Sequence, residues 1–147
     1  MAFFKFSALA FALVAGVNLA AQADEHAGHV WPDGAAPYII SPADGASVKS
    51  PVTVVFGLKG MGVAPAGIEK PKTGHHHLLI DTPAPGGEDL DYAIPADDHH
   101  IHFGGGQTET TVTLAPGKHT LQLMMGDANH VPHNPPLVSD IVTITVE

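Results

Sequence analysis

The chain has 147 residues, 11 histidines, no cysteine and a formal net charge of −9 at pH 7. Without cysteine it has neither a disulfide framework nor a thiol nucleophile. It also contains no arginine, and an acidic surface of this kind repels nucleic acid and anionic lipid while it attracts cations. We therefore expect no nucleic-acid partner, and the histidine content indicates a metal ion as the partner.

The first 23 residues have the pattern of a secretory signal peptide. Lys5 supplies a positive charge, residues 6–17 form an apolar run, and Ala21-Gln22-Ala23 fits an A-x-A cleavage site. The apolar run is shorter than the about 20 residues that a transmembrane helix needs, and no second run of that length follows. We expect cleavage near Ala23, no membrane span, and a periplasmic or secreted protein.

Residues 24–37 are rich in glycine, proline and histidine and are predicted to form a flexible or loosely docked N-terminal arm. From residue 38 onward, short β-favouring runs alternate with turn residues, without a helical repeat of apolar residues. Pro116-Gly117 gives the clearest hairpin signal. The predicted strands are residues 38–41, 51–58, 75–81, 97–103, 109–115, 118–125 and 137–146.

Seven short strands in one domain, residues 38–147, predict an all-β fold of the immunoglobulin-like or fibronectin-like antiparallel sandwich type. A small jelly roll or barrel is the alternative. In a sandwich traversed up and down, the loops after the second, fourth and sixth strands leave from the same end. That end would gather most of the histidines, namely His75, His76, His77, His99, His100, His102, His130 and His133.

Two histidine pairs on the predicted strands have H-x-H spacing, which places both imidazoles of a pair on one face of a strand. A further pair in the loop before the last strand would complete a ligand shell. Imidazole suits copper, zinc, nickel or iron, and the thioether of Met61 would shift the preference toward Cu(I). The candidate metal ligands are His75, His77, His100, His102, His130, His133 and Met61.

Other histidines are expected to have structural roles, because a single strand histidine is usually a hydrogen-bonded structural residue. His76 lies between two candidate ligands and should point into the core, and His99 and His119 are expected to be ordinary polar residues. A hydrogen-bonded histidine network without metal is the alternative for the whole group. Four carboxylates are candidates to fix imidazole tautomers as hydrogen-bond acceptors: Asp81, Asp97, Asp98 and Asp127.

A second, independent site depends on the cleavage position. Cleavage after Ala23 would start the mature chain at Asp24-Glu25-His26. The free amine of Asp24, two backbone amides and the imidazole of His26 would form a square-planar nitrogen set, which suits Cu(II) or Ni(II).

Several runs of the sequence resemble a bacterial family of small exported domains of unknown function, whose members are often labelled rod-shape-determining proteins. These runs are GHHHLLID from Gly74, HFGGGQTE from His102, LAPGKHTLQL from Leu114 and GDxxHxPHxPP from Gly126. The resemblance covers nearly all of residues 38–146 and implies an exported, mostly β domain. It implies no activity and no ligand set, and the rod-shape label refers to integral membrane proteins, which nothing here supports.

The expected function is therefore a periplasmic transition-metal-binding protein that sequesters, buffers or delivers copper, with zinc as the second choice. A metal-free binding or interaction module, which recognises a periplasmic partner protein or a small ligand, is the alternative. A metalloenzyme ranks third. Copper–zinc superoxide dismutases also carry an H-x-H pair on a β scaffold, but this chain lacks their disulfide and an arginine to guide an anion. It also lacks a G-x-S-x-G motif, so we expect a binding protein rather than an enzyme.

Overall fold

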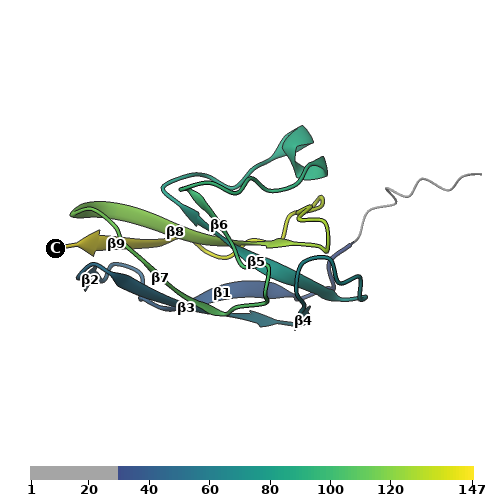
Figure 1. Cartoon of the computed structure of the whole chain (residues 1–147), viewed down its shortest axis with the longest axis horizontal. Helices are drawn as coiled ribbons and strands as arrows, with labels where there is room; N and C mark the ends of the chain where they lie inside the picture. Colours follow the sequence, from purple (N-terminus) through teal and green to yellow (C-terminus); the bar gives the residue numbers. More distant parts are fainter. Residues whose placement is uncertain (1–29) are drawn as a thin grey trace, which may run out of the picture.

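The computed structural model describes residues 30–147 as a sandwich of two β layers (Figure 1). The predicted signal peptide, its cleavage site and the Asp24/His26 motif lie outside the described residues. Within residues 30–147, no helix is long and apolar enough to cross a membrane.

One layer has the strand order β1-β3-β7, and the other has the order β2-β9-β8-β5-β4, with β6 paired to β5 as well. Most pairs are antiparallel, and the two-residue strands β2 and β4 pair in parallel. The strands are β1 (Ala36–Ser41), β2 (Ser47–Val48), β3 (Val52–Lys59), β4 (Gly62–Val63), β5 (Thr73–Ile80), β6 (His100–His102), β7 (Glu109–Val112), β8 (Gly117–Gly126) and β9 (Val142–Val146).

The main core lies between the layers, because alternate side chains of each strand point inward. Val54 and Phe56 of β3 are almost fully buried, and they belong to one cluster with Leu78 of β5 and Leu123 of β8. The predicted all-β sandwich is confirmed, and each of the seven predicted strands has a counterpart. Three are shorter than predicted: residues 97–99 contribute only an isolated bridge at Asp97, β7 ends at residue 112, and the last strand begins at residue 142. The hairpin predicted at Pro116-Gly117 is wrong, because β7 pairs with β3 in one layer and β8 pairs with β5 and β9 in the other.

A second, smaller core covers part of the outer face of the β5–β8 layer. The sequence between β5 and β6, which includes the 3₁₀ helix η1 (Gly87–Asp91), folds over this face at the top of Figure 1. Its Leu90 and Ile94 pack with Leu79 of β5 and Met124 of β8. The acidic residues, glycines and prolines of residues 81–99 are typical of a solvated loop. This segment, called the lid segment below, nevertheless makes apolar contacts with the sheet beside the histidine cluster.

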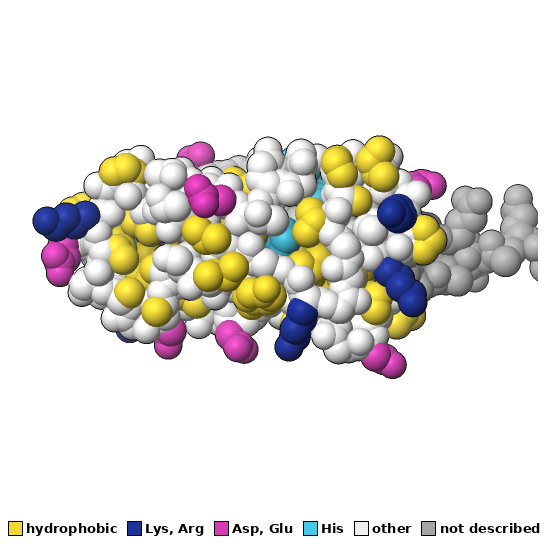
Figure 2. Space-filling model, turned by 90° about the horizontal axis from the view of Figure 1, so that it is seen from below, with side chains coloured by type: hydrophobic (Ala, Val, Ile, Leu, Met, Phe, Trp, Pro, Cys, Tyr) yellow, Lys and Arg dark blue, Asp and Glu magenta, His cyan; other side chains and the backbone are white. Residues whose placement is uncertain are grey.

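The N-terminal part of the described chain is attached to the domain. Trp31 is 9% exposed, and its Nε1 donates a hydrogen bond to the carbonyl of Pro132 at 2.9 Å. Strand β1 begins at Ala36, two residues before the predicted strand. Figure 2 shows the molecule from the side of the β1-β3-β7 layer, where charged side chains are scattered and histidine is visible over a very small area.

Candidate metal centre

Strand β5 places two histidines side by side on the outer face of its layer. His75 and His77 are 0% and 1% exposed, and their ring centroids are 4.8 Å apart. His76, between them, points to the opposite face, where its ring contacts Phe56 in the core at a centroid distance of 4.9 Å. The period-two alternation of a strand therefore separates the run of three histidines into an outward pair and an inward core residue.

The third histidine comes from β6, whose antiparallel register places His102 directly opposite His77. Residues opposite each other in such a pair share a face of the sheet. The rings of His77 and His102 are stacked, with centroids 5.1 Å apart and an interplanar angle of 29°. His102 is exposed, so the pair has one buried ring and one ring at the surface.

The fourth histidine, His130, comes from the loop between β8 and β9. Its backbone has a left-handed φ of 69°, which non-glycine residues adopt only where neighbouring contacts hold them. Asp127 supplies such contacts, because its Oδ1 accepts hydrogen bonds from the amides of Asn129 at 2.8 Å and Val131 at 2.9 Å. The carbonyl of His130 accepts a further bond from the amide of Ile94 at 2.9 Å, which links this loop to the lid segment.

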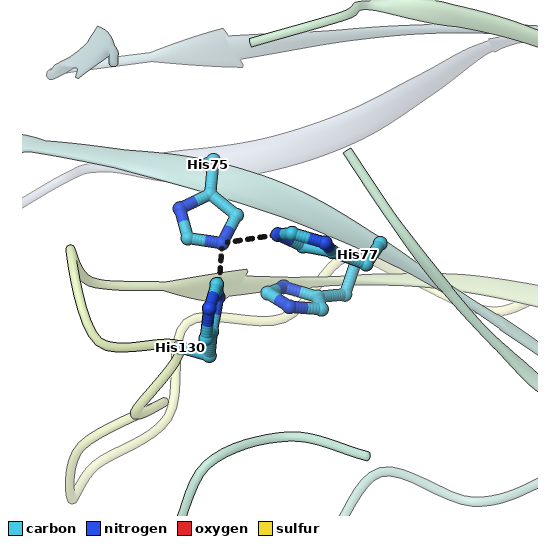
Figure 3. Close-up of side chains that lie close together, drawn as sticks. His75, His77 and His130 are labelled. Carbon is cyan, nitrogen blue, oxygen red and sulfur yellow. Dashed lines mark hydrogen bonds between the residues drawn. The ribbon is translucent and has the colours of Figure 1, made fainter. Parts of the chain in front are cut away.

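The ring nitrogens of these four histidines converge. The Nε2 atom of His75 lies 3.0 Å from Nδ1 of His130 and 3.2 Å from Nε2 of His102, and Figure 3 shows these two contacts as dashed lines. One potential ligand atom from each of the four residues lies within 4.8 Å of all the others. Nitrogens bound at about 2.0–2.1 Å to one tetrahedral ion are about 3.3–3.4 Å apart. The two short separations are thus close to those of a shared metal ion.

The hydrogen-bond inventory of the cluster is incomplete without a further partner. Neither ring nitrogen of the buried His77 has a hydrogen-bond partner among residues 30–147, and Nδ1 of His75 has none either. The single Nε2 of His75 must serve two neighbouring rings, although it carries either one proton or one lone pair. Leaving a buried polar group unsatisfied costs about 1–3 kcal/mol, so these unpaired nitrogens destabilise the fold when no ion is bound.

Electrostatics keeps the buried rings neutral, which is the form that binds metal. Burial, reinforced by the neighbouring rings of His102 and His130, lowers the pKa of His75 to about 4. Burial and the adjacent His75 lower the pKa of His77 to about 3. Burial and His130 also lower the pKa of His102. His75, His77 and His102 could therefore bind a metal ion near neutral pH without first losing a proton.

Three of the candidate ligands lie outside this group of four. His100 is on β6, but its Nδ1 pairs with Oδ1 of Asp97 at 2.8 Å. His133 pairs through Nε2 with Oδ2 of Asp127 at 3.0 Å, and its ring packs edge-on against Trp31. Met61 lies in the short connection between β3 and β4.

Three of the four carboxylates expected to orient the metal ligands pair instead with histidines outside the group. Asp97 and Asp127 bind His100 and His133, and Asp81 binds His119 through a 2.6 Å contact. His99 donates a hydrogen bond from Nδ1 to the carbonyl of Ile80 at 2.8 Å, so it has the ordinary polar role that was expected.

The three loops predicted to share one end of the sandwich are joined by hydrogen bonds. The amide of Ala66 donates to the carbonyl of Gly104 at 2.9 Å, and the amide of Gly67 donates to the carbonyl of Ala128 at 2.8 Å. These contacts link the β4–β5, β6–β7 and β8–β9 loops around the histidine cluster.

Residues 54–147 match the family model described as "Domain of unknown function (DUF4399)", and the chain belongs to this family. No curated protein matches the chain. No solved structure matches it either.

Proposed function

We propose that this protein is an exported metal-binding protein that holds one transition-metal ion between His75, His77, His102 and His130. The observation that carries the proposal is His77, a fully buried imidazole whose two nitrogens have no partner within residues 30–147. A bound ion would satisfy one of them and would replace the two competing contacts of His75. The acidic composition and the signal-peptide pattern support a role in the periplasm, in sequestration, buffering or delivery.

Copper is the preferred ion and zinc the alternative. A set of four neutral imidazoles is a borderline donor set that suits both Cu(II) and Zn(II), and Cu(II) binds such nitrogen sites more tightly than Zn(II) does. Four imidazoles suit Cu(II), whereas a thioether ligand would shift the preference toward Cu(I). A separate site at Asp24 and His26 remains part of the proposal, and it depends on cleavage after Ala23.

Metal titration of the mature protein, purified without a histidine tag, tests the proposal. The variant His26→Ala removes the N-terminal site and leaves the four-histidine site, so it should bind one Cu(II) or Zn(II) per chain by calorimetry. At 100 times Kd, bound metal should stabilise the fold by about 2.7 kcal/mol. A melting temperature unchanged by Cu(II), Zn(II) and Ni(II), without heat of binding, would rule the proposal out.

One observation favours the second candidate, a metal-free binding module. A pocket of about 550 Å³ lies in the lid segment, lined by His100, Tyr92 and the prolines at 83, 85 and 95. Its volume falls within the about 300–1,000 Å³ range of small-molecule sites. The metal titration separates the two candidates, because ligand binding in this pocket requires none of the four clustered rings.

A further inference from the structure

The ring of His102 has two close neighbours, and one of them is a glycine. The ring stacks on His77, with centroids 5.1 Å apart. It also lies against Gly104, two residues along the chain. A β-carbon added at Gly104 would overlap Cε1 of His102 and would lie 2.8 Å from its Nε2. That Nε2 is the atom that contacts His75.

We propose that Gly104 is a positioning residue of the metal centre, which fixes the ring of His102 by having no side chain. The effect of Gly104 on metal affinity rests on the proposed function. The effect of Gly104 on the placement of the His102 ring follows from the contacts alone.

The backbone conformation of Gly104 allows its effect on the His102 ring to be tested without unfolding the domain. Gly104 does not have a positive φ, so alanine is compatible with its backbone. The group that would have to move is the end of an exposed side chain rather than backbone, and an exposed histidine can change rotamer at small cost. Gly104→Ala should therefore displace the ring of His102 and leave the β sandwich intact.

Gly126 gives a useful contrast. A β-carbon there would lie 2.8 Å from Cε1 of His77 and 3.2 Å from the α-carbon of His130. His77 is buried, and the backbone of His130 cannot rotate away as an exposed side chain can. Gly126→Ala should therefore disturb both the fold and the site, which makes Gly104 the informative position.

The chain offers a matched control in the same loop. Gly105 also lacks a positive φ, and the three atoms nearest to a β-carbon there all belong to the side chain of Gln107, the closest at 3.0 Å. We expect Gly104→Ala to weaken Cu(II) or Zn(II) binding by about 10- to 100-fold, the range seen when an outer partner of a metal ligand is lost. We expect Gly105→Ala to bind as tightly as the wild type.

Two readouts separate positioning from a general structural effect. In a double-mutant cycle, Gly104→Ala should cause no further loss of affinity in a His102→Ala background, because the glycine acts only through that ring. In metal-free protein, the imidazole ¹⁵N resonances of His102 should change in Gly104→Ala and remain those of the wild type in Gly105→Ala.

The outcomes are distinguishable. Wild-type protein that binds no metal would overturn the proposed function, and the metal-free spectra would still decide the role of Gly104. Unchanged His102 resonances in Gly104→Ala would overturn the positioning role. So would wild-type affinity in that variant, or an additive loss in the double mutant.

Discussion

His77 and His102 lie directly opposite each other on β5 and β6, and their rings stack on the outer face of the sheet. His77 is buried and His102 is exposed, so the pair connects the interior of the cluster to solvent. A ligand set with this arrangement offers an ion a way in from one side while the other rings remain held by the strands.

The two histidines of β6 form a matched pair for mutagenesis. His102→Ala should lower the affinity for Cu(II) or Zn(II) by at least about 10- to 100-fold, because it removes one of four converging nitrogens. His100→Ala should leave the affinity unchanged, because His100 pairs with Asp97 outside the group. Calorimetric titration measures both, and equal losses in the two variants would contradict the ligand assignment.

His77 should show a conflict between stability and binding. In His77→Leu an apolar side chain replaces a buried ring whose nitrogens lack hydrogen-bond partners. The free energy of unfolding of the metal-free protein, measured by urea denaturation, should therefore be equal to that of the wild type or higher by up to about 1–2 kcal/mol. The same variant should lose the stabilisation by added metal.

The control for this experiment is His76→Leu, one residue along and on the opposite face of β5. Its ring faces Phe56, so the variant should retain the rise in melting temperature with metal. A metal-free His77→Leu protein that is more than about 1 kcal/mol less stable than the wild type would contradict the view that His77 is unsatisfied.

Asp81 and His119 form an ion pair whose contribution to stability should depend on pH. Their hydrogen bond raises the pKa of His119. For Asp81, burial acts to raise the pKa, but the hydrogen bonds from His119 and Thr120 outweigh it and lower the pKa. The histidine contribution is fully present below pH 6.5 and is lost as pH rises through its raised pKa. The carboxylate contribution is present above pH 3.8 and is lost as pH falls through the lowered pKa.

The pair should therefore contribute most between about pH 4 and 6.5. Asp81→Asn should reduce the free energy of unfolding in this window by about 0.5–1 kcal/mol, the scale of a partly exposed ion pair. Urea denaturation at pH 5.5 and pH 9 provides the measurement, with the high-pH value as the internal control. A difference that grew toward pH 9 would contradict the pairing.

Trp31, the single tryptophan, should report on the metal centre. It binds the carbonyl of Pro132 in the loop that carries His130, and its ring lies 3.3 Å from the β-carbon position of Gly74, the neighbour of His75. Cu(II) has low-lying d–d states that accept excitation energy at short range, whereas Zn(II), with a filled d shell, has none. In the His26→Ala variant, which lacks the N-terminal site, Cu(II) should quench the fluorescence and Zn(II) should not. Bound Cu(II) without quenching would place the ion elsewhere.

The strands and the location of the histidines could be predicted from sequence because both follow from local patterns. Alternation on β5 separates His76 from its neighbours, and the order of short strands brings three loops to one end. The choice among the histidines could not be predicted, because it depends on long-range partners. The β5–β6 register places His102 opposite His77, whereas Asp97 and Asp127 capture His100 and His133.

The lid segment was also not predictable in full. Its acidic residues and prolines indicate a solvated loop, and only Leu90 and Ile94 mark it as a covering for the sheet. Two apolar residues four apart, among prolines and acidic residues, are too few to form a recognisable helical or strand pattern. Their common environment appears only when Leu79 and Met124 are in place.

The run of three consecutive histidines has a consequence for how the chain finds its fold. A slip of β5 by one residue would exchange its two faces, sending His76 outward and turning His75 and His77 toward the interior. Such a misaligned sheet would present one imidazole of this strand where the native one presents two. An ion that requires all four imidazoles would therefore bind only chains with the native strand register, and its binding would stabilise that register over the shifted one.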